Sequence, residues 1–307
     1  MAADIPADTH AAAGFEPHRR HLYGLAYRML GSWSDAEDMV QEAWLRWREV
    51  DPARIDAPRA FLSRIVTRLC LDHLKSARMR REQYVGPWLP EPLPDAEAYA
   101  ANAPGEYAGD LSMALMLALE RLSPLERAAF LLHDVFDVPF PEIARTLGRG
   151  EAACRQLAAR ARVHVREARP RVRVTEQESM RIAAAFIEAS RRGDLEALQR
   201  LLAEDAVLHS DGGGKRRAAM RPVRGRDRIA RFFAGIARKY PPGMLWAVPA
   251  GLNGMPGVVE SEGDGSLRAT LVDIRDGRVA AVYIVRNPDK LGHLGRFGPA
   301  AGGAAQS

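Results

Sequence analysis

Residues 140–166 carry basic side chains in a pattern typical of a unit that binds nucleic acid. Nine arginines lie between Arg145 and Arg173, where the only acidic residues are two glutamates. Guanidinium groups pair well with phosphate oxygens, so this excess of positive charge favours a polyanionic partner such as duplex DNA. A basic face that is merely solvated is the plain alternative. The side chains that we expect to face DNA are Arg149, Arg155, Gln156 and Arg160.

Two short helices joined by a tight turn must position these side chains. Apolar residues at helical spacing predict the first helix, and Gly148 follows it where a left-handed residue commonly ends a helix. Small residues on the inner face of the second helix would let the two cross closely, as in the DNA-reading helix-turn-helix. The apolar residues are Ile143, Ala144 and Leu147 in the first helix, and Cys154, Ala158 and Ala161 in the second.

The composition agrees with a DNA-associated protein of several domains. The chain has 307 residues and a formal net charge of +5, which predicts two or three domains and suits a nucleic-acid partner. The two cysteines, Cys70 and Cys154, are expected to be small core residues in a reducing cytoplasm. We expect no metal site and no cofactor. No signal peptide and no membrane span is apparent, so a soluble, cytoplasmic protein is predicted.

Composition divides the chain into five zones. Two helix-rich zones flank a segment with five prolines, and a zone of mixed helices and strands precedes a tail that we expect to be disordered. The expected boundaries are residues 15–83, 84–110, 111–170, 175–291 and 292–307. The predicted fold is therefore multidomain: two all-α domains, the second with the helix-turn-helix, and one α+β domain.

The α+β zone predicts a cone-shaped domain with helices on a curved antiparallel sheet. Helices are expected at 175–202 and 226–240, and β-type runs near 206–211, 244–250, 255–261, 267–275 and 278–286. Asp276-Gly277 is a strong hairpin signal between the last two runs. In this interpretation five residues would line a pocket of the cone: His209, Asp211, Trp246, Asp273 and Tyr283. For His209 and Trp246, a packing role is the more ordinary interpretation.

The first helical zone has an acidic ridge and a basic helix. Ser34 is expected to cap a helix whose apolar stripe leaves Asp35, Asp38, Gln41 and Glu42 outside, at spacings of three and four residues. A loop that includes Arg54 precedes a second helix over 58–83, whose charged residues are mostly basic. The basic residues expected to follow phosphates are Arg59, Arg64, Arg68, Lys75 and Arg78.

These runs resemble the bacterial extracytoplasmic-function sigma factors. DAEDMVQEAWLRW (35–47) resembles their polymerase-binding helix, and PRAFLSRIVTRLCLDHLKSARMRR (58–81) resembles their promoter-melting helix. LSPLERAAFLLHDVFDVPFPEIARTLG (122–148) is similar to the start of their second DNA-binding region. Residues 15–83 then correspond to region 2 and residues 111–170 to region 4.

Three further motifs resemble the subgroup in which the sigma module is fused to a SnoaL-like domain. The motifs are Trp88, Leu89, Pro90, Glu91 and Pro92 (WLPEP); Asp211, Gly212, Gly213, Gly214 and Lys215 (DGGGK); and Asn287, Pro288, Asp289, Lys290 and Leu291 (NPDKL). We hypothesise that the three motifs meet and tie the C-terminal domain to the two DNA-binding regions.

The resemblance also implies partners and roles. The acidic ridge would contact core RNA polymerase, and the loop 48–57 would hold a base flipped from the −10 element of promoter DNA. Arg155, Gln156 and Arg160 would enter the −35 major groove. The chain is thus interpreted as a sigma factor, not an enzyme, that its own C-terminal domain regulates. A small-molecule ligand of that domain is left open.

Two other functions remain as alternatives. A one-component helix-turn-helix regulator with a C-terminal sensor would need no polymerase-binding ridge at 35–42. A pocket enzyme tethered to DNA would depend on residues such as Asp273.

Overall fold

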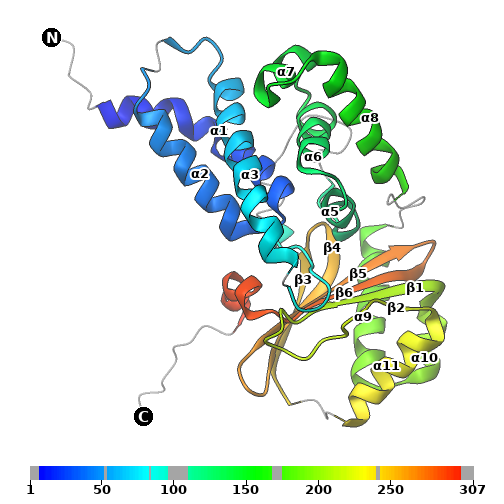
Figure 1. Cartoon of the computed structure of the whole chain (residues 1–307). Helices are drawn as coiled ribbons and strands as arrows, with labels where there is room; N and C mark the ends of the chain where they lie inside the picture. Colours follow the sequence, from blue (N-terminus) through cyan, green and yellow to red (C-terminus); the bar gives the residue numbers. More distant parts are fainter. Residues whose placement is uncertain are drawn as a thin grey trace, which may run out of the picture. The chain divides into compact units, whose positions relative to one another are not determined.

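The computed structural model describes residues 7–51, 54–82, 84–95, 110–167, 175–239 and 243–298. The chain divides into two compact units (Figure 1). Unit 1 comprises Met1–Glu82 and Ala96–Arg169, and unit 2 comprises Gln83–Asp95 and Pro170–Ser307. The proline-rich segment that follows the first helical zone therefore belongs to the C-terminal unit and not to the helices that it connects.

Helices are the secondary structure of unit 1 within its described residues, and short turns connect them. Its first half consists of α1 (Ala7–Leu30), α2 (Trp33–Arg48) and α3 (Pro58–Glu82), and its second half of α5 (Met113–Glu120), α6 (Pro124–Phe130), the π-helical turn η2 (Leu131–Val135), α7 (Phe140–Leu147) and α8 (Glu151–Glu167). The expected N-cap of α2 at Ser34 is wrong. Ser32 has the extended backbone of a cap, and its hydroxyl accepts a hydrogen bond from the amide of Asp35 at 3.2 Å.

Unit 2 is an α+β domain built on one six-stranded sheet. Its helices are α9 (Glu176–Arg192), α10 (Leu195–Leu201) and α11 (Arg226–Lys239), and its strands are β1 (Leu202–Asp211), β2 (Val223–Arg224), β3 (Met244–Leu252), β4 (Met255–Glu262), β5 (Leu267–Arg275) and β6 (Arg278–Val285). The strand order is β2-β1-β6-β5-β4-β3. The sheet is mixed and not wholly antiparallel, because β1 and β6 pair in parallel while every other pair is antiparallel.

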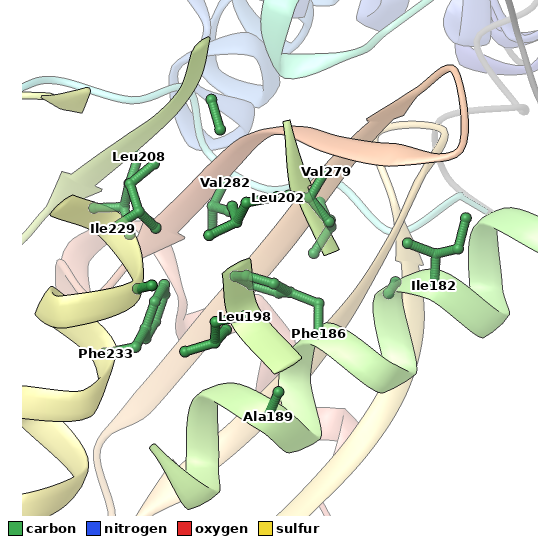
Figure 2. Close-up of a cluster of buried hydrophobic side chains, with 14 of the residues drawn as sticks. Ile182, Phe186, Ala189, Leu198, Leu202, Leu208, Ile229, Phe233, Val279 and Val282 are labelled. Carbon is green, nitrogen blue, oxygen red and sulfur yellow. The ribbon is translucent and has the colours of Figure 1, made fainter. Parts of the chain in front are cut away.

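The core of unit 2 lies between the helices and one face of this sheet. Phe186 on α9 packs edge-on against Phe233 on α11, with ring centroids 5.4 Å apart. Side chains of β1 and β6, among them Leu208 and Val282, complete the cluster from the sheet (Figure 2). Burial of these side chains removes a large apolar area from water and fixes the helices on this face.

The turn between β5 and β6 has the backbone conformation that its Asp-Gly sequence predicts. Asp276 and Gly277 both have positive φ, 50° and 70°, as a two-residue hairpin turn of the primed type requires. The expected disorder from residue 292 onward is wrong for its first residues, because Gly292–Phe297 form the 3-10 helix η4, which the fully buried Leu294 anchors. Residues 299–307 of the expected tail lie outside the described part of the chain.

Candidate nucleic-acid interface and buried junction

The helix-turn-helix of unit 1 has the local geometry that its sequence predicts. Gly148 ends α7 in the left-handed conformation, with φ 62° and ψ 41°. Ile143 of α7 and the small residues Cys154 and Ala158 of α8 are fully buried. Because these residues occupy the inner faces, the polar side chains of α8 are left on the outer face.

The expected DNA-facing side chains of this motif are all exposed. Arg155 pairs with Glu151 at 2.9 Å within α8, and Arg160 pairs with Glu126 of α6 at 2.7 Å. Exposed pairs of this kind contribute little to stability, so phosphates or bases can replace these partners at small cost. Arg149 and Gln156 lie on the same exposed part of the motif.

The acidic ridge lies on the outside of α2. Asp38 and Gln41 are exposed, whereas Asp35 and Glu42 are half-buried. Glu42 pairs with Arg46 at 3.1 Å, and Asp35 lies 3.5 Å from His73 of α3. The apolar stripe beneath them, which includes the fully buried Trp47, holds the ridge toward solvent.

The basic residues around α3 do not share one environment. Arg54 and Lys75 are exposed beside Asp51 and Asp72, at 3.3 and 2.7 Å. The guanidinium of Arg64 lies over the ring of Phe61. Of the remaining basic residues, Arg59 is exposed beside His21, and the side chain of Arg78 lies outside the described residues.

Arg68 differs from these residues because it connects the two halves of unit 1. Its guanidinium donates to the carbonyl oxygens of Arg145 and Thr146, both at 3.3 Å, near the end of α7. These are the last carbonyls of a helix, where the helix dipole favours a cation. A side chain that we expected to contact DNA therefore binds the helix-turn-helix in this structure.

The motifs WLPEP, DGGGK and NPDKL meet in unit 2, in a group of buried and half-buried residues that we call the junction cluster: Tyr84, Trp88, Leu89, Asp211, Asn287 and Lys290. The carboxylate of Asp211 is fully buried and accepts hydrogen bonds from the Tyr84 hydroxyl at 2.6 Å and the Leu89 amide at 2.9 Å. It also pairs with the Lys290 ammonium at 2.8 Å. Each charge in the cluster is thus met by its counter-charge or by hydrogen bonds, as buried charges require.

Lys290 holds the WLPEP segment through two further contacts. Its ammonium donates to the carbonyl oxygen of Leu89 at 2.5 Å and lies 4.1 Å from the centre of the Trp88 ring, a cation–π geometry. Asn287 donates to the Tyr84 hydroxyl at 2.9 Å. Burial, together with the Asp211 carboxylate, raises the pKa of Tyr84, so this residue acts as a hydrogen-bond donor.

Glycines of DGGGK permit this close packing. Gly213 has φ +60°, and a Cβ there would overlap the amide of Asn287. A Cβ at Gly212 would overlap the carbonyl oxygen of Arg216. Sequence reasoning selected all three motifs but missed Tyr84, a tyrosine beside a proline-rich run whose partners lie more than a hundred residues away.

A second attachment holds the same segment at the β3–β4 turn. The amide of Leu93 donates to the Asn253 side chain, and the amide of Asn253 donates back to the Leu93 carbonyl, both at 2.8 Å. His293 contacts Glu91 at 3.2 Å. Residues 84–95 are therefore fixed to unit 2 at both ends.

The polar residues expected to line a pocket lie on the other face of the sheet. Leu208, Val272 and Val282 point to the helices, so alternation along the strands directs His209, Asp273 and Tyr283 to the opposite face. Trp246 and Asp211 follow the same alternation. The expectation that these five residues line a common pocket under the helices is therefore wrong.

One pocket lies between α9 and strands β3 and β4 and measures about 220 Å³. Its walls are mostly apolar, with Glu188 and Arg191 as the charged residues among them.

A helix that spans a membrane needs both length and apolar character, and none of the described helices reaches both.

Comparison with known proteins identifies the three folded parts. Family models match residues 15–80 as Sigma-70 region 2, residues 112–165 as Sigma-70 region 4, and residues 183–286 as a SnoaL-like domain. The chain is 42% identical over 293 residues to the ECF RNA polymerase sigma factor SigJ of Mycobacterium tuberculosis, covering 90% of this chain and 92% of SigJ. It is 34% identical over 291 residues to the probable ECF RNA polymerase sigma factor SigI of that species, covering 92% of this chain and 95% of SigI.

Structural comparison agrees with the sequence comparison. The crystal structure of SigJ from M. tuberculosis matches with a TM-score of 0.75 and 40% identity, covering 92% of this chain and 98% of the SigJ chain. The resemblance drawn from the sequence motifs is thereby confirmed. The chain belongs to the extracytoplasmic-function RNA polymerase sigma factors, which bind core RNA polymerase and direct transcription from specific promoters, and it carries a SnoaL-like domain after region 4.

Proposed function

We propose that the SnoaL-like domain controls this sigma factor in cis, by holding the linker between region 2 and region 4. The supporting observation is the position of Leu89, whose amide and carbonyl are bound by Asp211 and Lys290, respectively. Both partners belong to the C-terminal domain, whereas Leu89 lies in the chain between the two promoter-binding regions. These contacts support the proposal, because a change in them inside unit 2 would alter the connection between the two regions.

The linker's length explains how docking would act. Tyr84 follows the last residue of α3 by two positions, so a docked segment ties unit 2 to the end of that helix. Residues 84–95 of the connection between region 2 and region 4 are then bound to unit 2, which leaves a shorter part of the chain to span the two regions. The −10 and −35 elements lie ~85 Å apart along DNA, from about 25 base pairs at ~3.4 Å each. Docking thus restrains a separation that promoter binding requires.

Run-off transcription with core RNA polymerase tests this restraint. Lys290→Met removes the charge that holds Leu89, and we expect more transcript from the same start site at equal sigma occupancy. The matched control is Arg181→Gln, which removes one exposed positive charge of the same domain. Equal or lower transcription from folded Lys290→Met protein, with the control unchanged, contradicts the proposal.

The site residues of the sigma module complete the proposal. Asp35, Asp38, Gln41 and Glu42 of α2 would contact core polymerase, because their ridge is directed to solvent above a buried stripe. The basic residues of α3 would follow the phosphates of the −10 region, and the exposed residues of α8 would enter the −35 groove. A cytoplasmic location is part of the same proposal, because these roles require DNA and core polymerase.

We further infer that the C-terminal domain acts as a regulator and not as a catalyst. Asp273, the residue on which the enzymatic alternative rests, is paired with Arg275 at 2.7 Å on the sheet face opposite the helical core. The pocket beside α9 is smaller than ~300 Å³, the lower end for drug-sized ligands, so a ligand there would be a small, mainly apolar molecule. Ile187→Trp should fill this pocket, and loss of ligand-induced thermal stabilisation in that variant would identify the site.

A further inference from the structure

The C-terminal domain carries a concentration of positive charge that its proposed regulatory role does not use. Residues 215–239 contain ten lysines and arginines and one acidic residue, Asp227. Two of the ten, Lys215 and Arg216, pair with Asp289 and Asp264. The others lie mainly on β2 and α11.

Helix α11 separates its apolar and basic residues onto opposite faces. Ile229, Ala230 and Phe233 are buried, and Figure 2 shows Ile229 and Phe233 directed into the core. Helical spacing therefore turns Arg228, Arg231 and Arg238 to the outside, where all three are exposed. We call these three residues the α11 basic face.

The neighbouring helices show how this face differs from an ordinary charged surface. On α9 and α10 the exposed arginines pair with a glutamate one turn away: Arg181 with Glu178, Arg192 with Glu188, and Arg200 with Glu196. Within the part of the chain that the structure describes, no carboxylate lies at ion-pair distance from any residue of the α11 basic face. Arg231 instead donates to the backbone carbonyl of Asp227.

Neighbouring elements only partly offset this charge. Asp227 on α11 accepts a hydrogen bond from Gln199 of α10. Glu204 and Asp205 are exposed on β1, the strand that pairs with β2 at Arg224. The positive charge is therefore concentrated along the outer face of α11.

The chemistry of the face fits duplex DNA. Guanidinium groups suit phosphate oxygens, and Arg228 and Arg238 lie ~15 Å apart along the helix axis, about the length of four base pairs. The apolar face of α11 is used by the core, so this helix is not built to insert into a membrane. Its aromatic residues also pack on the core, which disfavours stacking on single-stranded bases.

We propose that the α11 basic face contacts the phosphate backbone of promoter DNA, as a third DNA contact besides regions 2 and 4. Those regions already hold DNA, so the tethered domain meets the duplex at high effective concentration. The contact is independent of base sequence, because phosphates alone are bound. It adds affinity and salt dependence to the complex but no promoter preference.

Fluorescence anisotropy of the full chain with a labelled duplex of random sequence tests the proposal. The triple variant Arg228→Gln, Arg231→Gln, Arg238→Gln should bind about tenfold or more weakly at low salt. The slope of log K against log salt should fall by ~0.9 for each phosphate that the variant no longer neutralises, and thus by two to three for the set. The triple Lys variant keeps the charges and should retain most of the slope.

The matched control is Arg181→Gln, Arg192→Gln, Arg200→Gln, which removes the same charge from paired arginines of the same domain. An equal decrease of slope in this control would show a general effect of net charge and overturn the proposal. An unchanged slope in the α11 variant also overturns it. If that variant loses affinity for core polymerase but not for DNA, the face binds an acidic protein surface instead.

Discussion

Lys290 and Asp211, 79 residues apart in the sequence, form a buried ion pair of 2.8 Å, and Lys290 also donates to the carbonyl oxygen of Leu89. The pair and the docked linker therefore depend on each other. If Leu89 leaves, Asp211 loses the hydrogen bond from its amide, and Lys290 loses the carbonyl that it binds. Loss of hydrogen-bond partners from buried charges is costly, so the linker is held more firmly than one backbone contact would suggest.

Lys290→Met should lower the free energy of unfolding of unit 2 by ~3–5 kcal/mol, because it leaves the Asp211 carboxylate buried without its counter-charge. Urea unfolding followed by tryptophan fluorescence measures this decrease, because Trp88 and Trp246 both lie in unit 2. The double variant Lys290→Met, Asp211→Asn should recover part of it, since no isolated buried charge remains. Additive decreases in the double variant would contradict the coupling.

Gly213→Ala should destabilise the junction more than a matched glycine elsewhere. Gly213 has φ +60° and faces the Asn287 amide, whereas Gly265 has φ +79° with nothing within 4 Å of the added methyl group. Gly265→Ala should cost ~1–2 kcal/mol, from the left-handed backbone alone. Gly213→Ala should cost clearly more, and hydrogen exchange at the Leu89 amide should accelerate. Equal decreases in stability would show that the contact with Asn287 is unimportant.

The sequence predicts local structure well because local structure depends on local chemistry. Helical spacing and Gly148 define the helix-turn-helix, and Asp276-Gly277 defines the last hairpin. The three motifs were expected to meet, and the structure brings them together inside unit 2. The helix-turn-helix and the hairpin depend on residues close together in the sequence. The meeting of the three motifs was expected from the resemblance to a known subgroup.

The sequence does not reveal features that depend on long-range pairing. The parallel pairing of β1 with β6 joins strands about 75 residues apart, and no turn signal marks it. Tyr84 of the linker contacts Asp211, and Leu93 of the linker contacts Asn253, across more than a hundred residues of sequence. The contact of Arg68 with α7 is also invisible in the sequence, because an exposed arginine on a basic helix fits DNA binding equally well.

His21 should make unit 1 less stable in mild acid. Burial, with Arg59, His18 and Arg28 nearby, lowers the pKa of His21 from 6.5 to about 3. Arg59 donates to its Nδ1, and Nε2 therefore carries the proton and donates to Ser63. The folded state keeps this ring neutral, so its stabilising contribution is complete above pH 6.5 and is lost as the pH falls toward 3.

Between pH 7 and pH 5 the decrease in stability should amount to ~2 kcal/mol, at 1.36 kcal/mol for each pH unit below 6.5. Denaturant unfolding of the wild type and of His21→Gln at both pH values gives the difference, since other titrating groups contribute equally to both proteins. Parallel pH profiles for the two proteins would refute a neutral, buried His21.

Reversal of charge at Asp38 and Glu42 should abolish binding to core polymerase without loss of stability. Asp38 is exposed, and the half-buried Glu42 pairs with Arg46 in a solvent-accessible contact worth less than ~1 kcal/mol, so neither contributes much to the fold. A basic partner surface, by contrast, would meet two positive charges in place of two negative ones, and like charges at an interface cost several kcal/mol. Asp38→Arg with Glu42→Arg should therefore weaken the complex at least a hundredfold in a pull-down or anisotropy assay.

Glu178→Arg with Glu196→Arg makes the same charge change on unit 2 and should leave the affinity for core polymerase unchanged. Unaltered polymerase binding by the α2 variant would exclude this ridge as the interface.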